Sequence, residues 1–454
     1  MTLDQPSSGP VHISNSLLAE LGSFSIIDFD NNVASIAVQH NIAHRRLLEL
    51  SSTNKTASSA AQQQVLSEFS SLFRDMTSNQ IIVLFTYTGL LDAEPAKAHK
   101  LLQNCMAAAK QLEAGTWNGE QLSTDMLERL SVASGLTGTE TSEERFQHFA
   151  SDILTVHFGL EMLPNLLSNG NLHAQTATSQ SYNLKATVKH ARRFVALYEL
   201  ISGGSVDSQR VCIKIPSTIP GLQAMRYLSS GGQLDESHLG GPLPEGNIQV
   251  LATTIFAVEQ GLAAAQAAGA IYTAPYINAL AAHFFGAENP SQADKQIALS
   301  AGGRSMEETI YPLQRCLLRL RKDDPTIKTQ VMAASFLRIQ EAVELCGLDH
   351  VTLGAPIVER LANTELTAEY EQALKEARAK FSVADDAELE RYGAVSAAQE
   401  AQEVGYGAWL KESAQSYTRL QTVLEQDERC RYMLADALAR FTSAEEKLRD
   451  LFSA

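Results

Sequence analysis

Short apolar runs that alternate with longer segments of helical periodicity are the feature that most constrains the fold of this chain. Eight such runs occur, and each ends in turn or polar residues. Strands alternating with helices predict an α/β fold with a parallel sheet. In chain order the runs are FSIIDFD near Asp28, RDMTSN ending at Asn79, LHAQTATS around Gln175, VCIKIP around Lys214, IQVLATT ending at Thr254, AIYTAPY ending at Tyr276, TQVMAAS ending at Ser335 and HVTLGAP ending at Pro356.

Eight strands with intervening helices predict a TIM-type (β/α)8 barrel, in which catalytic groups come from the carboxyl ends of the strands. Beyond Leu361 the sequence becomes charged and helical. We therefore expect an amino-terminal extension over 1–22, a barrel over 23–362, and extra helices at the carboxyl terminus, over 363–454, packed on the barrel.

Composition limits the partners that we expect. The 454 residues are 44% hydrophobic, which predicts a globular protein, and the net charge of -16 argues against nucleic acid or an anionic membrane as a partner. Five scattered cysteines and an amino terminus without targeting features predict a cytoplasmic protein. The sequence has no zinc-type Cys/His spacing, GxGxxG, P-loop or HExxH, so we expect neither metal nor cofactor.

Lys214 is the residue that most suggests chemistry. It lies inside the apolar run VCIKIP, and a lysine is almost never buried unless its charge is paired or neutralised. An edge strand with its lysine turned to water is the alternative. In a parallel barrel, however, both faces of a strand are covered, so packing of Ile213 and Ile215 on the helices would direct Lys214 into the barrel.

Strand alternation assigns other side chains to shared faces. By this rule Cys212 and Pro216 accompany Lys214. The other expected sets are His173, Gln175 and Ala177; Leu251 and Thr253; Ala274 and Tyr276; and Ala333 and Ser335.

Several of these runs, in the same order, resemble motifs of the transaldolase family of class I, Schiff-base aldolases. IKIPSTIPGLQAM resembles the lysine strand, DMTSN the Asp-Ala-Thr-Thr-Asn signature, HFGLEML from His157 the Asn-Phe-Gly-Leu-Glu segment, MAASF from Met332 the seventh-strand signature, and RYMLADALARFTSAEEKLRDL from Arg431 the carboxyl-terminal helix. The resemblance runs from about Ser23 to the end, with insertions near 31–70, 110–150 and 365–420.

The resemblance implies roles for particular residues. Lys214 would form an iminium with a ketone, so that an adjacent C–C bond can break or form. Asp28 matches the first-strand carboxylate that moves protons, with Asp30 as its rival, and Asn79 matches an asparagine that binds the donor. The remaining substrate-binding positions would be Ala274, Asn278 and Ser335. Asp28 as a helix cap and Asn79 as a turn residue are the structural alternatives.

Two catalytic positions depart from the transaldolase pattern. The third-strand glutamate is replaced by Gln175, and the sixth strand reads Ala-Pro-Tyr, ending at Tyr276. Both features resemble the fructose-6-phosphate aldolase branch. The resemblance implies that Gln175, Thr253 and Tyr276 hold a catalytic water, with the tyrosine hydroxyl assisting proton transfer; a core aromatic is the alternative for Tyr276.

The phosphate-binding positions depart as well. Where the family has two arginines, this chain has Ala279 and Leu337. Without these guanidinium groups the bidentate contacts to phosphate are lost. Arg338 would replace one of them only if the strand bulged. His283 and its neighbours Phe284 and Phe285 either wall an acceptor pocket or pack a helix.

The expected function is therefore a class I aldolase with a small hydroxyketone donor, such as dihydroxyacetone, and an unphosphorylated aldehyde acceptor, with specialised metabolism as a possible role. A true transaldolase acting on sugar phosphates is the first alternative, and a catalytically inactive barrel used for binding is the second. A homodimer is a further expectation, and the carboxyl-terminal helix could cover its own barrel or a neighbour's.

Overall fold

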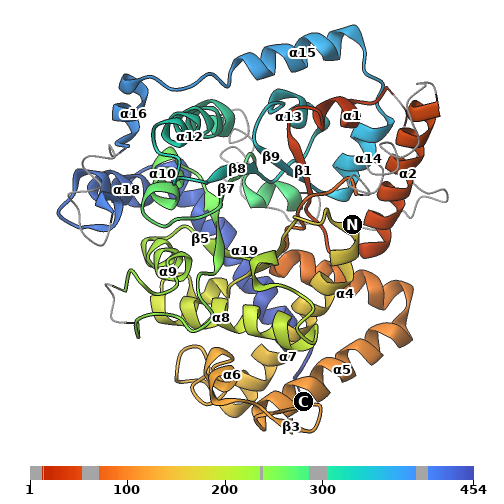
Figure 1. Ribbon diagram of the computed structural model, residues 1–454, viewed down its shortest axis with the longest axis vertical. Coiled ribbons are helices and arrows are strands. Elements are labelled where there is room, and N and C mark those ends of the chain that lie inside the picture. Colours follow the sequence, from red (N-terminus) through yellow and green to blue (C-terminus); the bar gives the residue numbers. More distant parts are fainter. Residues whose placement is uncertain are drawn as a thin grey trace.

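The computed structural model describes residues 13, 15–53, 71–235, 239–285, 304–394 and 407–453, without the side chains of residues 46–53. Seven parallel strands form one curved sheet at the centre (Figure 1), in the order β1-β9-β8-β7-β6-β5-β4. Their bounds are β1 (Ile26–Phe29), β4 (Leu172–Gln175), β5 (Val211–Pro216), β6 (Gln249–Ile255), β7 (Tyr272–Pro275), β8 (Gln330–Ala333) and β9 (His350–Leu353).

The second predicted strand closes the barrel, although it is reduced to single bridges. Met76 forms one parallel bridge to Phe29 of β1 and another to Leu172 of β4. Main-chain hydrogen bonds support both sides, including Phe29 N–H to Asp75 O at 2.9 Å and Met76 N–H to Asn171 O at 3.0 Å. The extended segment is short because α4 (Gln80–Ala93) already begins directly after Asn79.

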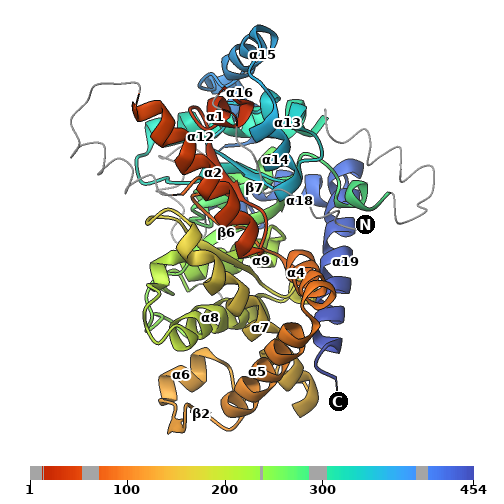
Figure 2. The same ribbon diagram turned by 90° about the vertical axis from the view of Figure 1, so that its right-hand side faces the viewer.

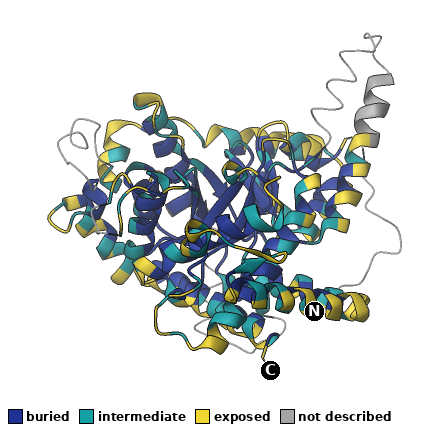
Figure 3. Ribbon diagram, turned by 60° about the horizontal axis from the view of Figure 1, so that its bottom comes forward, coloured by how far each residue is buried: buried dark blue, intermediate teal, exposed yellow. Residues whose placement is uncertain are grey.

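Helices connect the strands and cover the outside of the barrel, so the TIM-type α/β fold is confirmed. Figure 3 shows the buried strands surrounded by helices whose outer faces are exposed. The helices as far as residue 363 are α1 (Leu17–Leu21), α2 (Ala34–Thr53), α4, α5 (Pro95–Glu113), α6 (Thr124–Arg129), α7 (Ser142–Met162), α8 (Leu184–Ile201), α9 (Ile219–Ser229), α10 (Val258–Gln266), α12 (Tyr311–Asp323), α13 (Ile339–Glu344) and α14 (Ala355–Asn363). A small hairpin, β2 (Thr116–Trp117) and β3 (Glu120–Gln121), lies between α5 and α6, and a π-helical turn, η5 (Met306–Ile310), precedes α12.

Strand alternation correctly separates the inner and outer faces of β5. Ile213 and Ile215 belong to the main core between strands and helices. The barrel interior holds a separate apolar cluster of Cys212, Leu251, Tyr272, Ala274 and Met332.

The predicted pairing of Ala333 with Ser335 on one face is wrong. Met332 lies in the internal cluster, and Ala333 lies in the outer core. The strand ends at Ala333, and Ser335 has the left-handed φ of 69°. A left-handed residue breaks the alternation of a strand, so the position of Ser335 could not be extrapolated from its neighbours.

The helices after residue 363 pack on the barrel of their own chain. They are α15 (Ala368–Ala379), α16 (Asp386–Tyr392), α18 (Gln415–Glu425) and α19 (Glu428–Asp450). In Figure 2, α19 runs along one side of the molecule beside α4. Its residues Cys430, Met433, Leu434, Ala437, Leu438 and Phe441 share an apolar cluster with Phe256, Tyr276, Ala279 and Ala334. None of the helices in the described residues has the length and apolar character needed to cross a membrane.

Candidate active site

Lys214 is enclosed near the carboxyl end of β5. Its side chain is buried, with 3% of the residue exposed. Burial lowers the pKa of Lys214 below the ordinary 10.5, and the carboxylate of Asp30 offsets part of this shift. Among the described residues, no carboxylate oxygen lies within the 4.0 Å ion-pair distance of the lysine nitrogen. A buried amine of this kind is neutral more often than an exposed lysine.

The two first-strand aspartates have different surroundings. Asp28 is fully buried, and its carboxylate is occupied: His350 Nδ1 donates to Oδ2 at 2.7 Å, and the Asp75 N–H donates to Oδ1 at 3.0 Å. Asp30, one inward-facing position further along the chain, is the carboxylate that acts electrostatically on Lys214. Asp28 therefore belongs to a lower layer of the barrel, whereas Asp30 lies at the level of the lysine.

A chain of hydroxyl groups holds Asp30. Thr77 Oγ1 donates to Asp30 Oδ1 at 2.6 Å, and the Thr352 hydroxyl lies 2.6 Å from Thr77 Oγ1. Because Thr77 uses its single proton for Asp30, Thr352 is the donor to Thr77. The second carboxylate oxygen of Asp30, Oδ2, takes no part in these hydroxyl hydrogen bonds, so it is available to a substrate hydroxyl.

Thr253 and Tyr276 meet across neighbouring strands. Thr253 Oγ1 and the Tyr276 hydroxyl are 3.2 Å apart, and both side chains are buried. Burial raises the pKa of Tyr276; the hydrogen bond with Thr253 opposes this change, and Asp30 adds to it. The phenol therefore remains protonated at neutral pH and can donate a proton. The pairing of β6 with β7 shifts register between Ala252 and Ile255, an irregularity of a kind that is common beside active sites.

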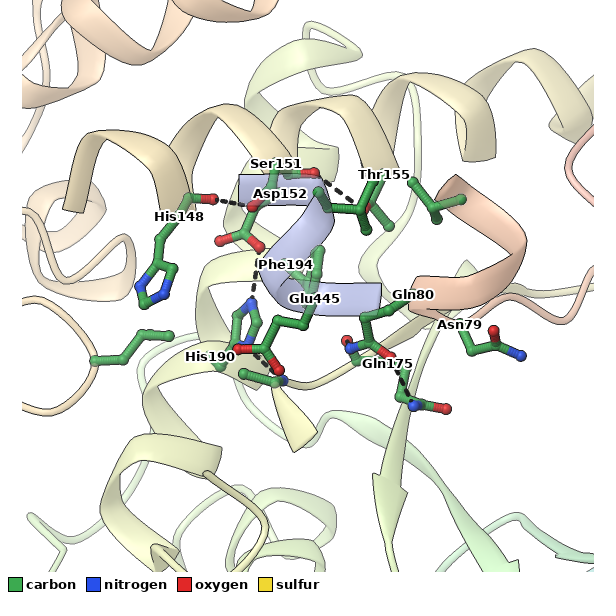
Figure 4. A pocket seen from close by; sticks show the side chains of 14 residues that line it. Asn79, Gln80, His148, Ser151, Asp152, Thr155, Gln175, His190, Phe194 and Glu445 are labelled. Atoms are coloured by element: carbon green, nitrogen blue, oxygen red, sulfur yellow. Dashed lines mark hydrogen bonds and ion pairs between the residues drawn. The ribbon is translucent and has the colours of Figure 1, made fainter. Parts of the chain in front are cut away.

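Gln175 ends β4, and its Cα is the register partner of Lys214. Its Nε2 donates to Gln80 Oε1 at 2.7 Å, and its own Oε1 is buried without a hydrogen-bond partner among the described residues. Figure 4 shows this contact, with Gln80 at the start of α4 facing Gln175 at the end of β4. The amide nitrogen is therefore occupied and the amide oxygen is not.

Asn79 is the amino-terminal cap of α4. Its Oδ1 accepts from the Ile82 N–H at 3.0 Å, as is usual for an asparagine in this position. The cap uses only the oxygen of the side chain, so Nδ2 is left as a hydrogen-bond donor. The capping role and the expected role in binding a donor are thus compatible.

The other predicted substrate-binding residues lie on β7 and just after β7 and β8. Ala274 belongs to the apolar interior. Asn278 Nδ2 donates to Ser335 O at 2.8 Å, and Ser335 Oγ donates to Asn278 O at 2.9 Å. His283 Nε2 lies 2.8 Å from Ser335 Oγ, and since the serine proton is already used, the imidazole is the donor.

His283 is the residue of the HFF segment that faces the site. Burial lowers its pKa, and the carboxylates of Asp30 and Glu341 oppose that change. The imidazole is therefore neutral at pH 7. Phe284 instead contacts Phe85 of α4, with ring centroids 6.4 Å apart.

The two positions of the expected phosphate clamp hold no cation. Ala279 is buried in the apolar cluster under α19. The Leu337 N–H donates to the buried carboxylate of Glu341 at 2.7 Å. Arg338 does not replace the missing arginine, because its side chain is 71% exposed and pairs with Glu341 at 3.1 Å.

The described residues contain no group of three or more His, Cys, Asp or Glu side chains suited to binding a metal ion.

Sequence reasoning missed Gln80, Thr77 and Thr352, and it ranked Asp30 second. Thr77 lies within the recognised DMTSN motif and Gln80 follows it directly. Their place in the motif could have marked both residues as neighbours of the site. Thr352 alternates with His350 along β9, which could have placed it in the barrel. The signal for Asp30 was its shared face with Asp28, but alternation does not say which of two residues is level with Lys214.

Comparison with known proteins identifies the family of this chain. The family described as Transaldolase/Fructose-6-phosphate aldolase matches residues 61–451. The transaldolase of Aeromonas salmonicida is 28% identical over 220 residues, which are 48% of this chain and 58% of that protein. The probable transaldolase of Dictyostelium discoideum is 26% identical over 246 residues, 54% of this chain and 65% of that protein.

A transaldolase of Prochlorococcus marinus is 26% identical over 300 residues, which are 66% of this chain and 77% of that protein. The chain thus spans only about half to two thirds of the length of several curated relatives that it matches. The family match nevertheless covers most of the barrel and reaches into α19. The chain belongs to the transaldolase/fructose-6-phosphate aldolase family.

Proposed function

We propose that this protein is a class I aldolase that forms or cleaves a C–C bond through a Schiff base on Lys214. The observation that carries the proposal is an enclosed lysine with a lowered pKa, level with Gln175 and within electrostatic range of Asp30. The donor is a small hydroxyketone such as dihydroxyacetone. The acceptor is an aldehyde without a phosphate group.

In the proposed first stage, the neutral Lys214 amine attacks the ketone carbon of the donor. A C–N bond forms, the carbonyl electron pair moves to oxygen, and that oxygen takes up two protons, one lost by the amine nitrogen and the second from an acid. Loss of that oxygen as water leaves an iminium, which then withdraws electrons from the adjacent carbon. The Tyr276 phenol, paired with Thr253 at 3.2 Å, supplies the second proton through a water that Gln175 helps to hold.

In the proposed second stage, Asp30 acts as the base for cleavage. Its free carboxylate oxygen takes the proton of the substrate hydroxyl, whose O–H electrons form the new carbonyl, and the electrons of the breaking C–C bond move into the enamine. The synthetic direction runs the same steps in reverse. Asp30 suits this role better than Asp28 because both Asp28 oxygens already accept hydrogen bonds from His350 and Asp75.

The preference for an uncharged acceptor rests on the electrostatics of the site around Lys214. The clamp positions are Ala279 and Leu337, and Arg338 is exposed and neutralised by Glu341. His283 donates to Ser335 and is held neutral by burial. A phosphate group here would meet the carboxylate of Asp30 without a guanidinium partner from the described clamp positions, which is unfavourable.

Trapping with borohydride tests the Schiff base. Incubation of the protein with dihydroxyacetone and sodium borohydride should add the mass of the reduced donor at a single site, and peptide mapping should locate it at Lys214. A Lys214→Met variant is the control and should gain no mass. Modification spread over exposed lysines, with Lys214 unmodified, would contradict the proposal.

A true transaldolase is the second candidate, because the relatives cited above carry that name. Its activity would be seen as transfer of a dihydroxyacetone unit from fructose 6-phosphate to erythrose 4-phosphate. We expect this turnover to be slower than the reaction of dihydroxyacetone with glyceraldehyde. The reverse order would favour the transaldolase and contradict the argument from Ala279 and Leu337.

A further inference from the structure

Two glutamines, Gln80 and Gln175, form a pair beside Lys214. We infer that Gln80 is a positioning residue that fixes the amide of Gln175 with its oxygen facing the reaction, so that the bound water is held by an acceptor. This inference rests on the proposed aldolase function and concerns the same site.

The amide of Gln80 has only one consistent orientation. Its Nε2 lies 3.0 Å from Thr176 O and 3.2 Å from Gln175 O. Main-chain carbonyl oxygens only accept hydrogen bonds, so the group facing them must be the NH2. Gln80 is buried at the start of α4, and turning its amide over would put three oxygens together without a proton.

The orientation of Gln80 dictates that of Gln175. With its NH2 committed to the two carbonyls, Gln80 presents Oε1, an acceptor, to its partner. The facing atom of Gln175, 2.7 Å away, must then be Nε2, and Oε1 is directed away from the pair. Figure 4 shows the same arrangement, in which only the Gln175 nitrogen points at Gln80.

The Gln175 amide oxygen is an acceptor without a hydrogen bond. It is buried and has no partner among the described residues. A buried acceptor without a hydrogen bond is unfavourable, so the site favours a ligand that donates. Gln175 is the register partner of Lys214, and Pro216 two residues later is the partner of Thr253, so a water donating to this oxygen would lie on the lysine side of the barrel.

The same geometry explains why a glutamine stands where the transaldolase pattern has a glutamate. A carboxylate at position 175 would face Gln80 Oε1 at hydrogen-bond distance, and two acceptors would repel. The repulsion would be relieved only by protonation of the carboxyl group, which raises its pKa. Gln80 thus commits the water site to a neutral acceptor and leaves proton donation to Tyr276.

The first test is Gln80→Met, which keeps the length of the side chain and removes all three of its hydrogen bonds. We expect the rate of borohydride-trapped iminium formation with dihydroxyacetone to fall about tenfold, the effect of one well-placed hydrogen bond, with less than a twofold change in the KM for dihydroxyacetone. Gln314→Met is the matched control, because Gln314 is also a buried glutamine but lies on α12; its trapping rate should match wild type. An equal fall in both variants, or no fall in Gln80→Met, overturns the inference.

The second test couples the two positions. Gln175→Glu should lower the trapping rate at pH 7 at least fivefold more when Gln80 is present than in the Gln80→Met background, where the opposing oxygen is gone. The pH profile of Gln175→Glu should show a raised carboxyl pKa when Gln80 is present. That raised pKa should be absent from the profile of the double variant. A merely structural role for Gln80 would give the same penalty and the same profile in both backgrounds, which would overturn the inference.

Failure of the proposed function is distinguishable from failure of this inference. If wild type traps no donor on Lys214, the aldolase proposal fails. If wild type traps donor and Gln80→Met traps it at the wild-type rate, only the positioning role fails. Melting temperatures of all variants show whether a slower rate reflects a damaged fold, and in that case the pH profile of Gln175→Glu decides.

Discussion

The barrel interior contains two polar layers that treat their charged groups in opposite ways. The lower layer, or floor, holds Asp28 with His350 at 2.7 Å and Asp75 with His173 at 3.1 Å. The upper layer, or mouth, holds Lys214 without an ion-pair contact among the described residues and Gln175 with an oxygen that lacks a partner. Both layers are buried, so burial alone does not separate structural from reactive groups.

Pairing is the difference that matters. In the floor, His350 Nε2 also lies 3.3 Å from Gln330 Oε1, and Asn171 N–H donates to Asp75 at 2.9 Å. Both carboxylates of the floor have an imidazole partner, although His173 Nδ1 itself has none among the described residues. Removal of one member of such a buried pair is costly. In the mouth, the Lys214 amine has no ion-pair partner and the Gln175 amide oxygen has no hydrogen-bond partner among the described residues, so both are available to a ligand. The comparison therefore supports the proposal that Asp30 acts in the reaction, whereas Asp28 stabilises the fold.

Replacement of the lysine should give the largest change in activity. Lys214→Met removes the nucleophile, so the aldol rate with dihydroxyacetone and glyceraldehyde should fall below detection. The variant should also be more stable at pH 7, because a buried amine is replaced by an apolar side chain. We expect its free energy of unfolding to be about 1–3 kcal/mol larger than that of wild type and its unfolding temperature to be higher. If Lys214→Met kept its activity or were less stable than wild type, the contrast between a reactive mouth and a structural floor would be wrong.

Exchange of the mouth aspartate should give the next largest effect. Asp30→Asn keeps the shape and removes the base, so kcat should fall about 10²- to 10⁴-fold. The free energy of unfolding should change by less than about 1 kcal/mol, since Asp30 is only partly buried and keeps the Thr77 hydroxyl as a neighbour. Unfolding curves in urea measure the second quantity on the same samples.

Exchange of the floor aspartate should give the opposite result. Asp28→Asn leaves His350 buried without its carboxylate, which should cost about 3 kcal/mol or more of stability. At a temperature where the variant is folded, its kcat should stay within about tenfold of wild type. If Asp28→Asn loses activity as severely as Asp30→Asn while remaining stable, the assignment of the two aspartates is reversed.

The pH dependence of the mouth should be visible in the activity of wild type. The reactive form of Lys214 is the free amine, and burial lowers its pKa below 10.5. The value of kcat/KM should therefore rise with pH and level off at a pH below 10.5. A profile that still rises at pH 10.5 would show an ordinary, exposed lysine.

The floor should give the smallest effect, a change of stability with pH. Burial opposes the charging of His350, but the Asp28 carboxylate outweighs this and raises the pKa of His350 above 6.5. A raised histidine pKa stabilises the fold fully below pH 6.5, and this contribution is lost as the pH rises through the higher value. The unfolding free energy of wild type should fall above pH 6.5, and that of His350→Gln should fall less, by about 1 kcal/mol.

The fold was predictable from sequence because its signal is repeated. Alternation of apolar runs and helices identified the barrel, and the alternation within VCIKIP placed Lys214 inside it. The rule failed at Ser335, where a left-handed residue with φ of 69° breaks the strand geometry. For Asp28 and Asp30 the rule gives a shared face, but it does not give the height of each side chain in the barrel.

The contacts between elements distant in sequence were the least predictable. Gln80 and Gln175 are 95 positions apart, and nothing in either segment alone shows that they meet. The same holds for Asp28 and His350, which are brought together only by the pairing of β1 with β9. These contacts depend on the register of the closed barrel, which composition and periodicity do not determine.

The placement of α19 has a consequence for when the site around Tyr276 is completed during folding. Its buried side chains pack against Phe256, Tyr276 and Ala279, so one wall around the Tyr276 phenol comes from a segment that is made long after the strands. A growing chain can assemble all its barrel strands and still expose the phenol to bulk water. The Tyr276 phenol is therefore fully enclosed only once α19 has docked on the barrel.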